Sequence, residues 1–418
     1  MNYQNNLDFA KSQDTADPLR KYRSQFHFPK QNGKDVLYFC GNSLGLQPVT
    51  AINYVQQEFD DWAKLGVEGH LHAKHPWFSY HEILTDKAAR IVGALPTEVV
   101  MMNQLTVNLH LLMVSFYRPT KKRYKILCEA KAFSSDQYAL ESQAKFHGFD
   151  PVEAIVEVYP RDGEHTIRTE DILFHIEQNA EELALVMFGG VNFYTGQFFE
   201  IDTITKAAHG VGAIAGFDLA HAAGNVKLSL HDWDVDFASW CTYKYLNSGP
   251  RSVSGVFIHE KHHRSNLPRF AGWWGYDKST RFQMEKNFKP IPTAEGWQLS
   301  NAPVFSMAVH CASLDIFDEA GMDALVDKSK KLTNYLEFII EEVNSHKKVI
   351  EIITPPENRG CQISFIVSEN GKELFNEIIQ KGVVVDWREP NVIRLAPVPL
   401  YNSFEDVYLF GKTLKNLF

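Results

Sequence analysis

Short apolar runs alternate with stretches of helical periodicity along most of the chain. The runs at 36–40, 99–102, 125–129, 152–158, 183–188, 213–217, 237–241 and 255–259 predict strands. Between them, apolar residues recur at helical spacing over 48–65, 78–92, 106–117, 169–179 and 203–209, and a further helix is expected after residue 136. This alternation is typical of an α/β fold, in which a mostly parallel sheet carries helices on both faces.

The pattern changes near residue 303. Two long helices over 304–319 and 322–346 lead to strands at 362–367, 383–386 and 392–395, with a helix over 372–380. This tail predicts a smaller C-terminal α+β domain. The first residues are polar and weakly patterned, with a short helix expected over 18–25. We therefore expect an arm (1–35), a large α/β domain (36–302) and a small domain (303–418).

Composition narrows the classes of partner and compartment. The 418 residues carry a net charge of -9, with 42 basic and 51 acidic side chains and no basic block, which argues against nucleic acid. No apolar run approaches the roughly 20 residues that cross a bilayer, and the first residues show no targeting pattern. Five widely spaced cysteines are typical of a reducing compartment, so we expect a cytoplasmic protein without membrane contact.

Two charged residues stand at the ends of apolar runs. Asp218 follows the run at 213–217, and Lys244 comes just after the run at 237–241. If both runs are strands of one sheet, the two side chains lie at the same edge. A desolvated lysine can form a Schiff base, although a solvated surface lysine is the alternative. An aspartate for a pyridinium nitrogen and a lysine for an aldehyde are the two groups that a pyridoxal phosphate (PLP) site requires.

Hydroxyl groups follow two other predicted strands. Thr106 opens a helix, where it is first a capping residue, but the free N–H groups of that helix end could also hold a phosphate. Phe133, Ser134, Ser135 and Asp136 cluster after the strand at 125–129. Open α/β sheets bind ligands at the carboxyl ends of their strands, which makes this cluster a candidate pocket wall.

Two other motifs suggest different chemistry. Residues 41–45, GNSLG, match the nucleophile elbow of serine hydrolases, with Ser43 as the nucleophile. The motif comes before most of the sheet, so we interpret it as a glycine-rich turn that lines a pocket and keep the hydrolase as a distant alternative. His70, His72 and His75 have no cysteine or carboxylate at ligand spacing. We therefore predict no metal site and place them in a substrate-facing or surface loop.

The C-terminal half offers further candidates. Arg394 lies inside an apolar strand and needs an anion, either a structural carboxylate or the carboxylate of a substrate. Trp273, Trp274 and Trp297 lie in an irregular stretch whose composition suits a pocket wall or interface, or plain core packing.

With these residues in place, the chain resembles kynureninase, a family of PLP-dependent hydrolases with the aminotransferase-like fold type I. The resemblance rests on FYTGQ at 193–197, GFDLAHA at 216–222, YKYLN at 243–247 and RLAPVPLYNS at 394–403. These blocks span most of the chain, from about residue 36 to its end. Asp218 and Lys244 alone would indicate only the superfamily, whereas the blocks together indicate the family.

The resemblance implies which residues contact the cofactor. The phosphate would be held by Leu105, Thr106, Ser134, Ser135 and Tyr243. The ring would be contacted by Phe133, which stacks on it, by Asp218 at its nitrogen, and by Asp136 and His221. Lys244 would carry the aldehyde and act as the proton shuttle, with Tyr243 as a possible relay.

The resemblance also implies a shared site and a substrate side. Trp273 and Asn301 would reach the cofactor across the interface of a homodimer. Arg394 would bind the α-carboxylate of an amino-acid substrate. Asn42, Ser43 and His70 would line the substrate side, and His70, Trp274 and Asn301 are candidates for sensing the ring hydroxyl. At Gly189 some relatives carry a hydroxyl residue, so one small cofactor contact is expected to be absent or replaced by water.

The implied reaction is hydrolysis of a carbon–carbon bond in a ketonic amino acid. L-kynurenine or 3-hydroxy-L-kynurenine would yield L-alanine and anthranilate or 3-hydroxyanthranilate, in tryptophan degradation or NAD synthesis. A cysteine desulfurase or an aminotransferase would share Asp218 and Lys244. Both remain alternatives within the same fold.

Overall fold

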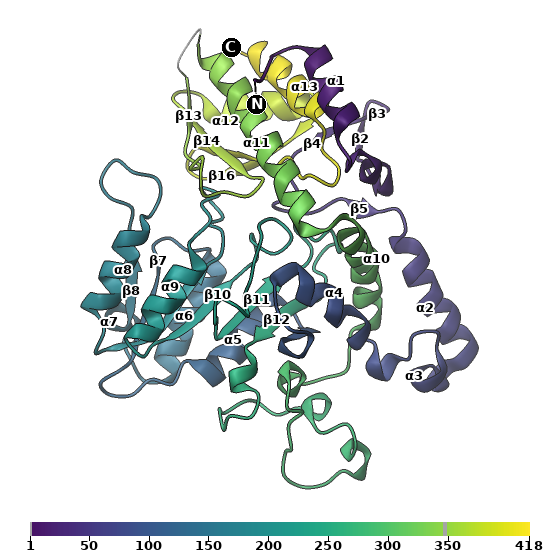
Figure 1. Cartoon of the computed structure of the whole chain (residues 1–418), viewed down its shortest axis with the longest axis vertical. Helices are drawn as coiled ribbons and strands as arrows, with labels where there is room; N and C mark the ends of the chain where they lie inside the picture. Colours follow the sequence, from purple (N-terminus) through teal and green to yellow (C-terminus); the bar gives the residue numbers. More distant parts are fainter. Residues whose placement is uncertain (1, 346–348) are drawn as a thin grey trace.

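The computed structural model describes residues 2–345 and 349–418 and consists of a large α/β part and a smaller part above it (Figure 1). The large part is built on one seven-stranded sheet in the order β6-β12-β11-β10-β9-β7-β8. Its strands are β6 (Val99–Met102), β7 (Lys125–Glu129), β8 (Ile155–Val158), β9 (Leu183–Gly189), β10 (Ile214–Asp218), β11 (Phe237–Cys241) and β12 (Ser254–Ile258). The five neighbouring strands β8, β7, β9, β10 and β11 are parallel, and β12 is antiparallel to both of its neighbours, β11 and β6. The predicted mostly parallel sheet is confirmed.

Both faces of this sheet are buried, which explains why its strands are continuous apolar runs in the sequence. Side chains alternate between the faces, so that along β6 Val99 and Met101 enter one core and Val100 and Met102 enter the other. The first core is covered by helices α4 (Glu82–Val92), α8 (Thr169–Gln178), α9 (Ile201–Gly210) and α10 (Val304–Ala320). The core on the other face of the sheet is covered by α5 (Leu105–Phe116) and α6 (Ser134–Phe146).

The smaller part has its own core, called the second core below, around a four-stranded antiparallel sheet. Its strands run in the order β13 (Ile350–Ile352), β14 (Ile363–Val367), β17 (Val392–Leu395) and β16 (Asp386–Arg388). Helices α11 (Met322–Asn344), α12 (Gly371–Gln380) and α13 (Phe404–Lys415) pack on it. The predicted α+β character of the C-terminal region agrees with this arrangement. The predicted end of α11 at His346 lies outside the described residues.

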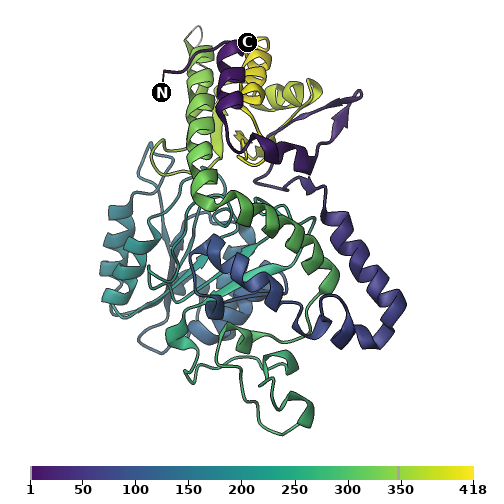
Figure 2. The ribbon, with the colours of Figure 1, turned by 45° about the vertical axis from the view of Figure 1, so that its right-hand side comes forward.

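The N-terminal segment packs on this second core and contains a helix that the sequence pattern did not predict. Helix α1 (Leu7–Ala16) is capped by the Asn6 side chain and lies beside α13, as both views show (Figure 2). Ala10 is buried in the second core, whereas α10 packs on α2 (Ala51–Leu65) and α4 in the large part. The predicted domain boundaries after residues 35 and 302 stay predictions.

Several predicted elements have different bounds. The strand expected at 36–40 is β4 (Leu37–Tyr38), which pairs with β15 (Val383–Val384). The strand expected at 152–158 begins with one helical turn, α7 (Pro151–Ala154), because the Asp150 side chain caps it and a proline occupies its first position. The remaining short elements are α3 (Gly69–His72), β1 (Phe26–His27) with β5 (Gln47–Pro48), and β2 (Lys30–Gln31) with β3 (Lys34–Asp35). None of the described helices is long and apolar enough to cross a membrane.

Candidate active site

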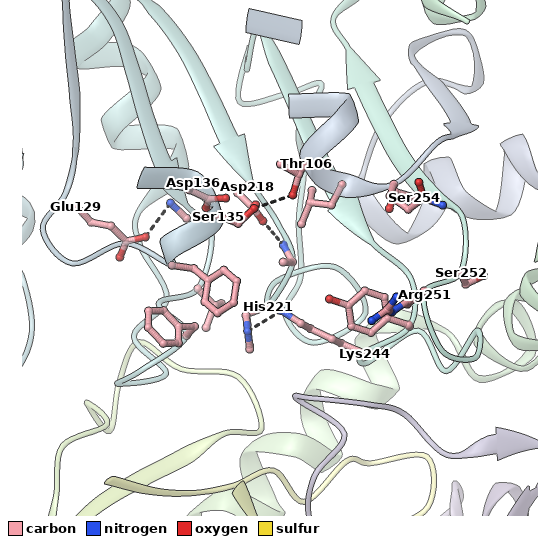
Figure 3. A pocket seen from close by; sticks show the side chains of 18 residues that line it. Thr106, Glu129, Ser135, Asp136, Asp218, His221, Lys244, Arg251, Ser252 and Ser254 are labelled. Atoms are coloured by element: carbon pink, nitrogen blue, oxygen red, sulfur yellow. Dashed lines mark hydrogen bonds between the residues drawn. The ribbon is translucent and has the colours of Figure 1, made fainter. Parts of the chain in front are cut away.

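The carboxyl ends of the parallel strands and the N-termini of α5 and α6 surround a cavity of about 550 Å³ (Figure 3). This is where an open α/β sheet is expected to bind a ligand. Half of its 18 lining residues were candidates from the sequence: Leu105, Thr106, Phe133, Ser135, Asp136, Asp218, His221, Tyr243 and Lys244. The fold therefore brings these nine predicted site residues together, while their individual roles stay predictions.

A lysine and a histidine face each other inside the cavity. Lys244 Nζ lies 2.9 Å from His221 Nε2 (Figure 3), and it lies 5.9 Å from the ring centroids of both Phe133 and Tyr243. Burial, and then the charge of Lys244, hold the pKa of His221 well below its usual range. The neutral imidazole can accept a hydrogen bond from the lysine amine through Nε2. Its Nδ1 is buried and has no partner among the described residues.

Three carboxyl groups line the opposite wall; Glu129 and Asp218 are buried and Asp136 is half-buried. Asp218 accepts a hydrogen bond of 2.7 Å from the Ala220 N–H. Burial raises the pKa of both Asp136 and Asp218, and the shift is larger for Asp136 because it also faces the Asp218 charge. Of the two, Asp136 is the carboxyl group that is more readily protonated. Burial raises the pKa of Glu129 to about 7, although the amide of Asn192 and the N–H of Gly189 both stabilise its charged form.

The other end of the cavity is rich in hydrogen-bond donors. Thr106 Oγ1 and Ser135 Oγ lie 2.7 Å apart at the first turns of α5 and α6. Neither helix has a side-chain cap, so the first N–H groups of both helices are available for an anion. Arg251, Ser252 and Ser254 line the same cavity (Figure 3). This end is suited to a phosphate group.

Ser134 and Arg394 lie beside this cavity or behind its wall. Ser134 is the first residue of α6 and is exposed, but it does not line the cavity. Arg394 is fully buried and donates to Asp386 and to the carbonyl of Phe193, which does line the cavity. The sequence left two partners open for Arg394, and in this chain a structural carboxylate occupies one side of its guanidinium. Its Nε is buried and has no partner among the described residues.

Asn42 and Ser43 belong to the glycine-rich turn. Asn42 is buried and donates to Gln362 Oε1 at 3.1 Å, and Ser43 is half-buried. Both glycines of the turn are explained by packing, since a Cβ at Gly41 would lie 2.3 Å from Tyr401 Oη and one at Gly45 would lie 2.4 Å from the Lys244 carbonyl oxygen. The turn does not lead directly into a helix, as a nucleophile elbow would, because α2 begins only at Ala51.

The four remaining candidates do not line this chain's cavity. His70 packs against Phe78, with ring centroids 4.9 Å apart, and Phe78 packs against the buried Trp274 at 5.6 Å. Trp273 and Asn301 are exposed. None of the four is among the described residues that line this cavity.

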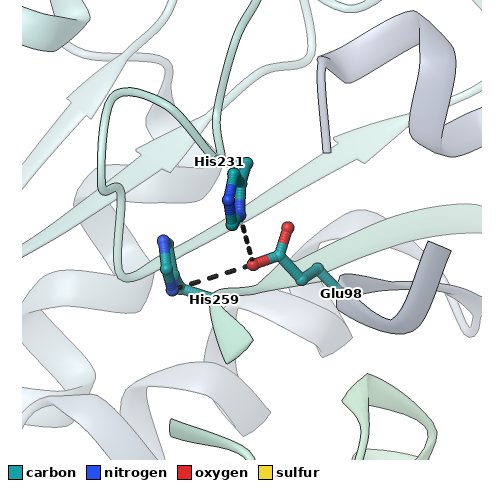
Figure 4. A group of neighbouring side chains, drawn as sticks. All are labelled: Glu98, His231 and His259. Carbon is teal, nitrogen blue, oxygen red and sulfur yellow. Dashed lines mark hydrogen bonds and ion pairs between the residues drawn. The ribbon is translucent and has the colours of Figure 1, made fainter. Parts of the chain in front are cut away.

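A separate group of two histidines and a glutamate lies away from the cavity (Figure 4). Glu98 Oε1 lies 3.0 Å from His231 Nδ1 and accepts a hydrogen bond of 2.9 Å from the Glu260 N–H. His259 Nδ1 accepts from the Lys261 N–H at 3.2 Å, and the two imidazole rings stack with centroids 5.0 Å apart. These hydrogen bonds account for the group without a metal ion, and the prediction of no metal site stays a prediction.

Nine lining residues were not candidate contacts, although Gly189 was noted for an expected missing contact: Gln104, Glu129, Gly189, Val191, Phe193, Ala220, Arg251, Ser252 and Ser254. Two signals in the sequence could have found some of them. Glu129 is a charged residue at the end of an apolar run, like Asp218, and Phe193 opens the FYTGQ block. Arg251 gives no local signal, since it reaches the cavity only because the loop after Lys244 turns back beside it.

Comparisons with known proteins agree with this geometry. The kynureninase C-terminal domain family matches residues 325–414. Kynureninase of Flavobacterium psychrophilum is 59% identical, and the match covers 99% of each chain. Kynureninase of Myxococcus xanthus is 56% identical over 99% of this chain and 97% of its own.

The chain belongs to the kynureninase family. Solved structures with the same fold but low identity include a mutant of C-DES with glycine covalently linked to its PLP cofactor. It has a TM-score of 0.77 at 13% identity and covers 91% of this chain and 96% of its own. The cysteine desulfurase CsdA of Escherichia coli has a TM-score of 0.77 at 14% identity and covers 95% and 98%. At these low identities, the similarity shows only that this kynureninase family member shares their fold.

Proposed function

We propose that this kynureninase family member hydrolyses L-kynurenine, 3-hydroxy-L-kynurenine or both, and releases L-alanine with anthranilate or 3-hydroxyanthranilate. The observation that carries the proposal is the position of Lys244 in one cavity with the buried Asp218 and a donor-rich end formed by two helix N-termini. The high identity to full-length relatives named kynureninase supports it.

We propose PLP as the cofactor because each part of it has a suitable partner in the cavity. The Lys244 amine suits an aldehyde, the Asp218 carboxylate suits a protonated ring nitrogen, and the uncapped ends of α5 and α6 suit a phosphate. The Phe133 ring lines the cavity at the entrance to α6, where it could stack on a planar ring. When bound, PLP supplies an electron sink for a carbanion at the substrate's α-carbon.

Within this proposal, Lys244 moves protons at the reacting carbons, because its amine is tethered inside the cavity. The neutral His221 accepts a hydrogen bond from that amine and so orients its lone pair. Burial raises the pKa of the Tyr243 phenol well above its usual range, which leaves it as a hydrogen-bond donor near neutral pH. Burial raises the pKa of Asp218, whereas the Ala220 N–H and the Lys244 charge favour its ionised form.

We assign the substrate's α-carboxylate to Arg394, whose Nε has no partner among the described residues. A guanidinium can bind a carboxylate with two parallel hydrogen bonds, and the Phe193 carbonyl already fixes its orientation. Asn42 would face the same side of the site; its Oδ1 is buried, lacks a partner in the described residues and is an acceptor, so it suits a donor group of the substrate and not the carboxylate. Ser43 lies next to it.

We further propose that two copies form a homodimer with a shared site. Trp273 and Asn301 are exposed and absent from their own chain's cavity. Large apolar side chains are also exposed on and near α2, and Trp62 packs against Phe305 there. Light scattering would test the dimer. Mixing Lys244→Ala with Asn301→Ala subunits should restore activity, because a mixed dimer regenerates one intact site.

The experiment that tests the activity compares both substrates at steady state on PLP-loaded protein. A higher kcat/KM for 3-hydroxy-L-kynurenine would place the enzyme in NAD synthesis, and a preference for L-kynurenine would place it in tryptophan degradation. Lys244→Ala should lose turnover and the visible absorption of bound PLP, while Lys412→Ala, on the exposed side of α13, should keep both. Release of neither alanine nor anthranilate by the wild type would refute the proposal.

The alternatives within the fold receive less support. A cysteine desulfurase uses a nucleophilic thiol, but the described cavity is lined by no cysteine. An aminotransferase would need a keto acid for turnover, which the hydrolysis assay omits. All five cysteines are free, and four are buried, which supports our proposal that the protein works in the reducing cytoplasm.

A further inference from the structure

Glu129 is a buried carboxyl group for which the proposed reaction has no direct use. It is the last residue of β7 and is 5% exposed, and it lines the cavity with Asp136 and Asp218 (Figure 3). A buried carboxylate is costly unless donors satisfy both oxygens. The Gly189 N–H donates to Oε1 at 3.1 Å, and the Asn192 amide donates to Oε2 at 2.6 Å. The carboxylate therefore ties β7 to the loop that follows β9.

Asn192 also holds the residues that follow it in the loop. Its Oδ1 accepts the N–H groups of Tyr194 and Thr195 at 3.0 and 2.9 Å and the Thr195 hydroxyl at 3.1 Å. With three donors on Oδ1, the amide has only one orientation, in which Nδ2 must find an acceptor. Glu129 is that acceptor. The Asn192 side chain thus links the Glu129 carboxylate to the turn at 192–195, so that a shift of the carboxylate would change the conformation of the turn.

The turn presents the Phe193 carbonyl to the second core. That carbonyl accepts hydrogen bonds from Arg394 and from Gln362 Nε2, the latter at 3.1 Å. The Phe193 ring also packs edge-on against Phe133, with centroids 5.3 Å apart. A displaced turn would therefore move the group that orients Arg394, although Arg394 and Glu129 belong to different sheets.

We infer that Glu129 is a positioning residue that acts through Asn192 and the Phe193 carbonyl to orient Arg394 for the substrate's carboxylate. This inference rests on the proposed function, because it assigns the effect of Glu129 to substrate binding. The carboxylate also packs against Gly189, where a Cβ would lie 2.6 Å from Glu129 Oε1. A side chain at residue 189 would therefore displace the carboxylate that fixes the loop.

The test exchanges the two partners. Glu129→Gln leaves one acceptor oxygen for two donors, the Gly189 N–H and the Asn192 amide, so that one of them must face an amide NH2. Asn192→Asp places two carboxylates against each other. The double variant E129Q/N192D restores one donor and one acceptor, and the aspartate introduced at 192 still accepts from Tyr194 and Thr195. Glu157→Gln, on the neighbouring strand and outside the described cavity lining, is the matched control.

For each variant, we would measure kcat and KM for L-kynurenine, the PLP affinity of the apo protein by fluorescence titration, and the thermal midpoint. We expect each single variant to raise KM about 10-fold, with smaller changes in kcat and PLP affinity, since one hydrogen bond to a charged group is lost. The double variant should return KM to within about 3-fold of the wild type, because its hydrogen bonds are restored. The control should match the wild type.

Several results would overturn the inference. One is a wild-type KM in both folded single variants, and another is a raised KM that the exchange does not restore. If neither single variant folds, the double variant decides alone: a wild-type KM supports the relay, and a raised KM or a failure to fold rejects it. A wild type that turns over neither substrate would first refute the proposed function, and this inference with it.

Discussion

Replacing Arg394 by lysine separates its two possible partners. The guanidinium is fully buried and donates to Asp386 and to the Phe193 carbonyl, and only Nε is without a partner among the described residues. A lysine keeps the charge but not the planar fork, so it cannot hold Asp386, Phe193 and a substrate carboxylate in the same geometry. We therefore expect Arg394→Lys to weaken substrate binding more than it weakens the fold.

The size of the effect follows from the hydrogen bonds that are lost. A bond to a charged group contributes about 1.5–3 kcal/mol, and the substitution removes one of the pair made to the substrate's carboxylate. The KM for L-kynurenine should then rise roughly 10- to 100-fold, with a smaller change in kcat. Burial already lowers the pKa of Arg394, and a lysine loses its charge more readily in such a place. The KM of the variant should therefore rise further between pH 7 and 9.

The assay follows anthranilate fluorescence at steady state over that pH range. Arg388→Lys is the control, since Arg388 also lies 3.1 Å from the Asp386 carboxylate but is one-third exposed. Its KM should stay within about 2-fold of the wild type, because exposed ion pairs contribute little. If Arg394→Lys lowers the free energy of unfolding while KM stays at the wild-type value, the arginine is only the counterion of Asp386 and the assignment is wrong.

Three further predictions concern affinity and stability. Arg251→Gln should raise the PLP dissociation constant of the apo protein about 10-fold in a fluorescence titration, because Arg251 is the one arginine among the described cavity residues; an unchanged constant would place its side chain in solvent. Burial lowers the pKa of His310 to about 3, so stability from its neutral form is lost as pH falls from 6.5 toward 3. His310→Asn should remove about 2 kcal/mol of the loss between pH 6.5 and 4.5 in urea unfolding. An equal pH dependence in both proteins would contradict this. Lys328→Met should lower the free energy of unfolding by about 3–5 kcal/mol, because it leaves the buried Asp17 carboxylate without the ammonium that lies 2.7 Å away. Adding Asp17→Asn should recover part of this loss; no recovery would show that the pair is not coupled.

The large sheet could be predicted from the sequence because both of its faces are covered. A strand buried on two sides must be apolar throughout, and β6, β7 and β9 to β11 all appear as such runs. Asp218 and Lys244 could be found for the same reason. Each is a charged residue that ends or follows an apolar run at the carboxyl edge of the sheet.

The helices at the chain ends were harder to predict, although each has a local signal. Helix α1 has low amphipathicity and buries only Ala10 fully, so its pattern is weak and its capping residue, Asn6, is the clearer sign. Helix α13 begins with a capping box in which Ser403 and Asp406 bond each other's backbone N–H groups. In both cases the caps indicate where the helix begins, but only packing against the second core makes it stable.

The substrate side could not be predicted from local pattern, because two separate cores meet there. The FYTGQ block leaves β9 at the cavity, yet it is held from the second core: Arg394 and Gln362 donate to the Phe193 carbonyl, and the Thr354 hydroxyl donates to the Thr195 carbonyl. The register of β14 against β17 decides which face Arg394 enters, and no residue near it in sequence encodes that choice. A substrate bound at Arg394 would therefore contact both cores at once, so a shift of one core against the other would change KM without any change in the residues that hold the cofactor.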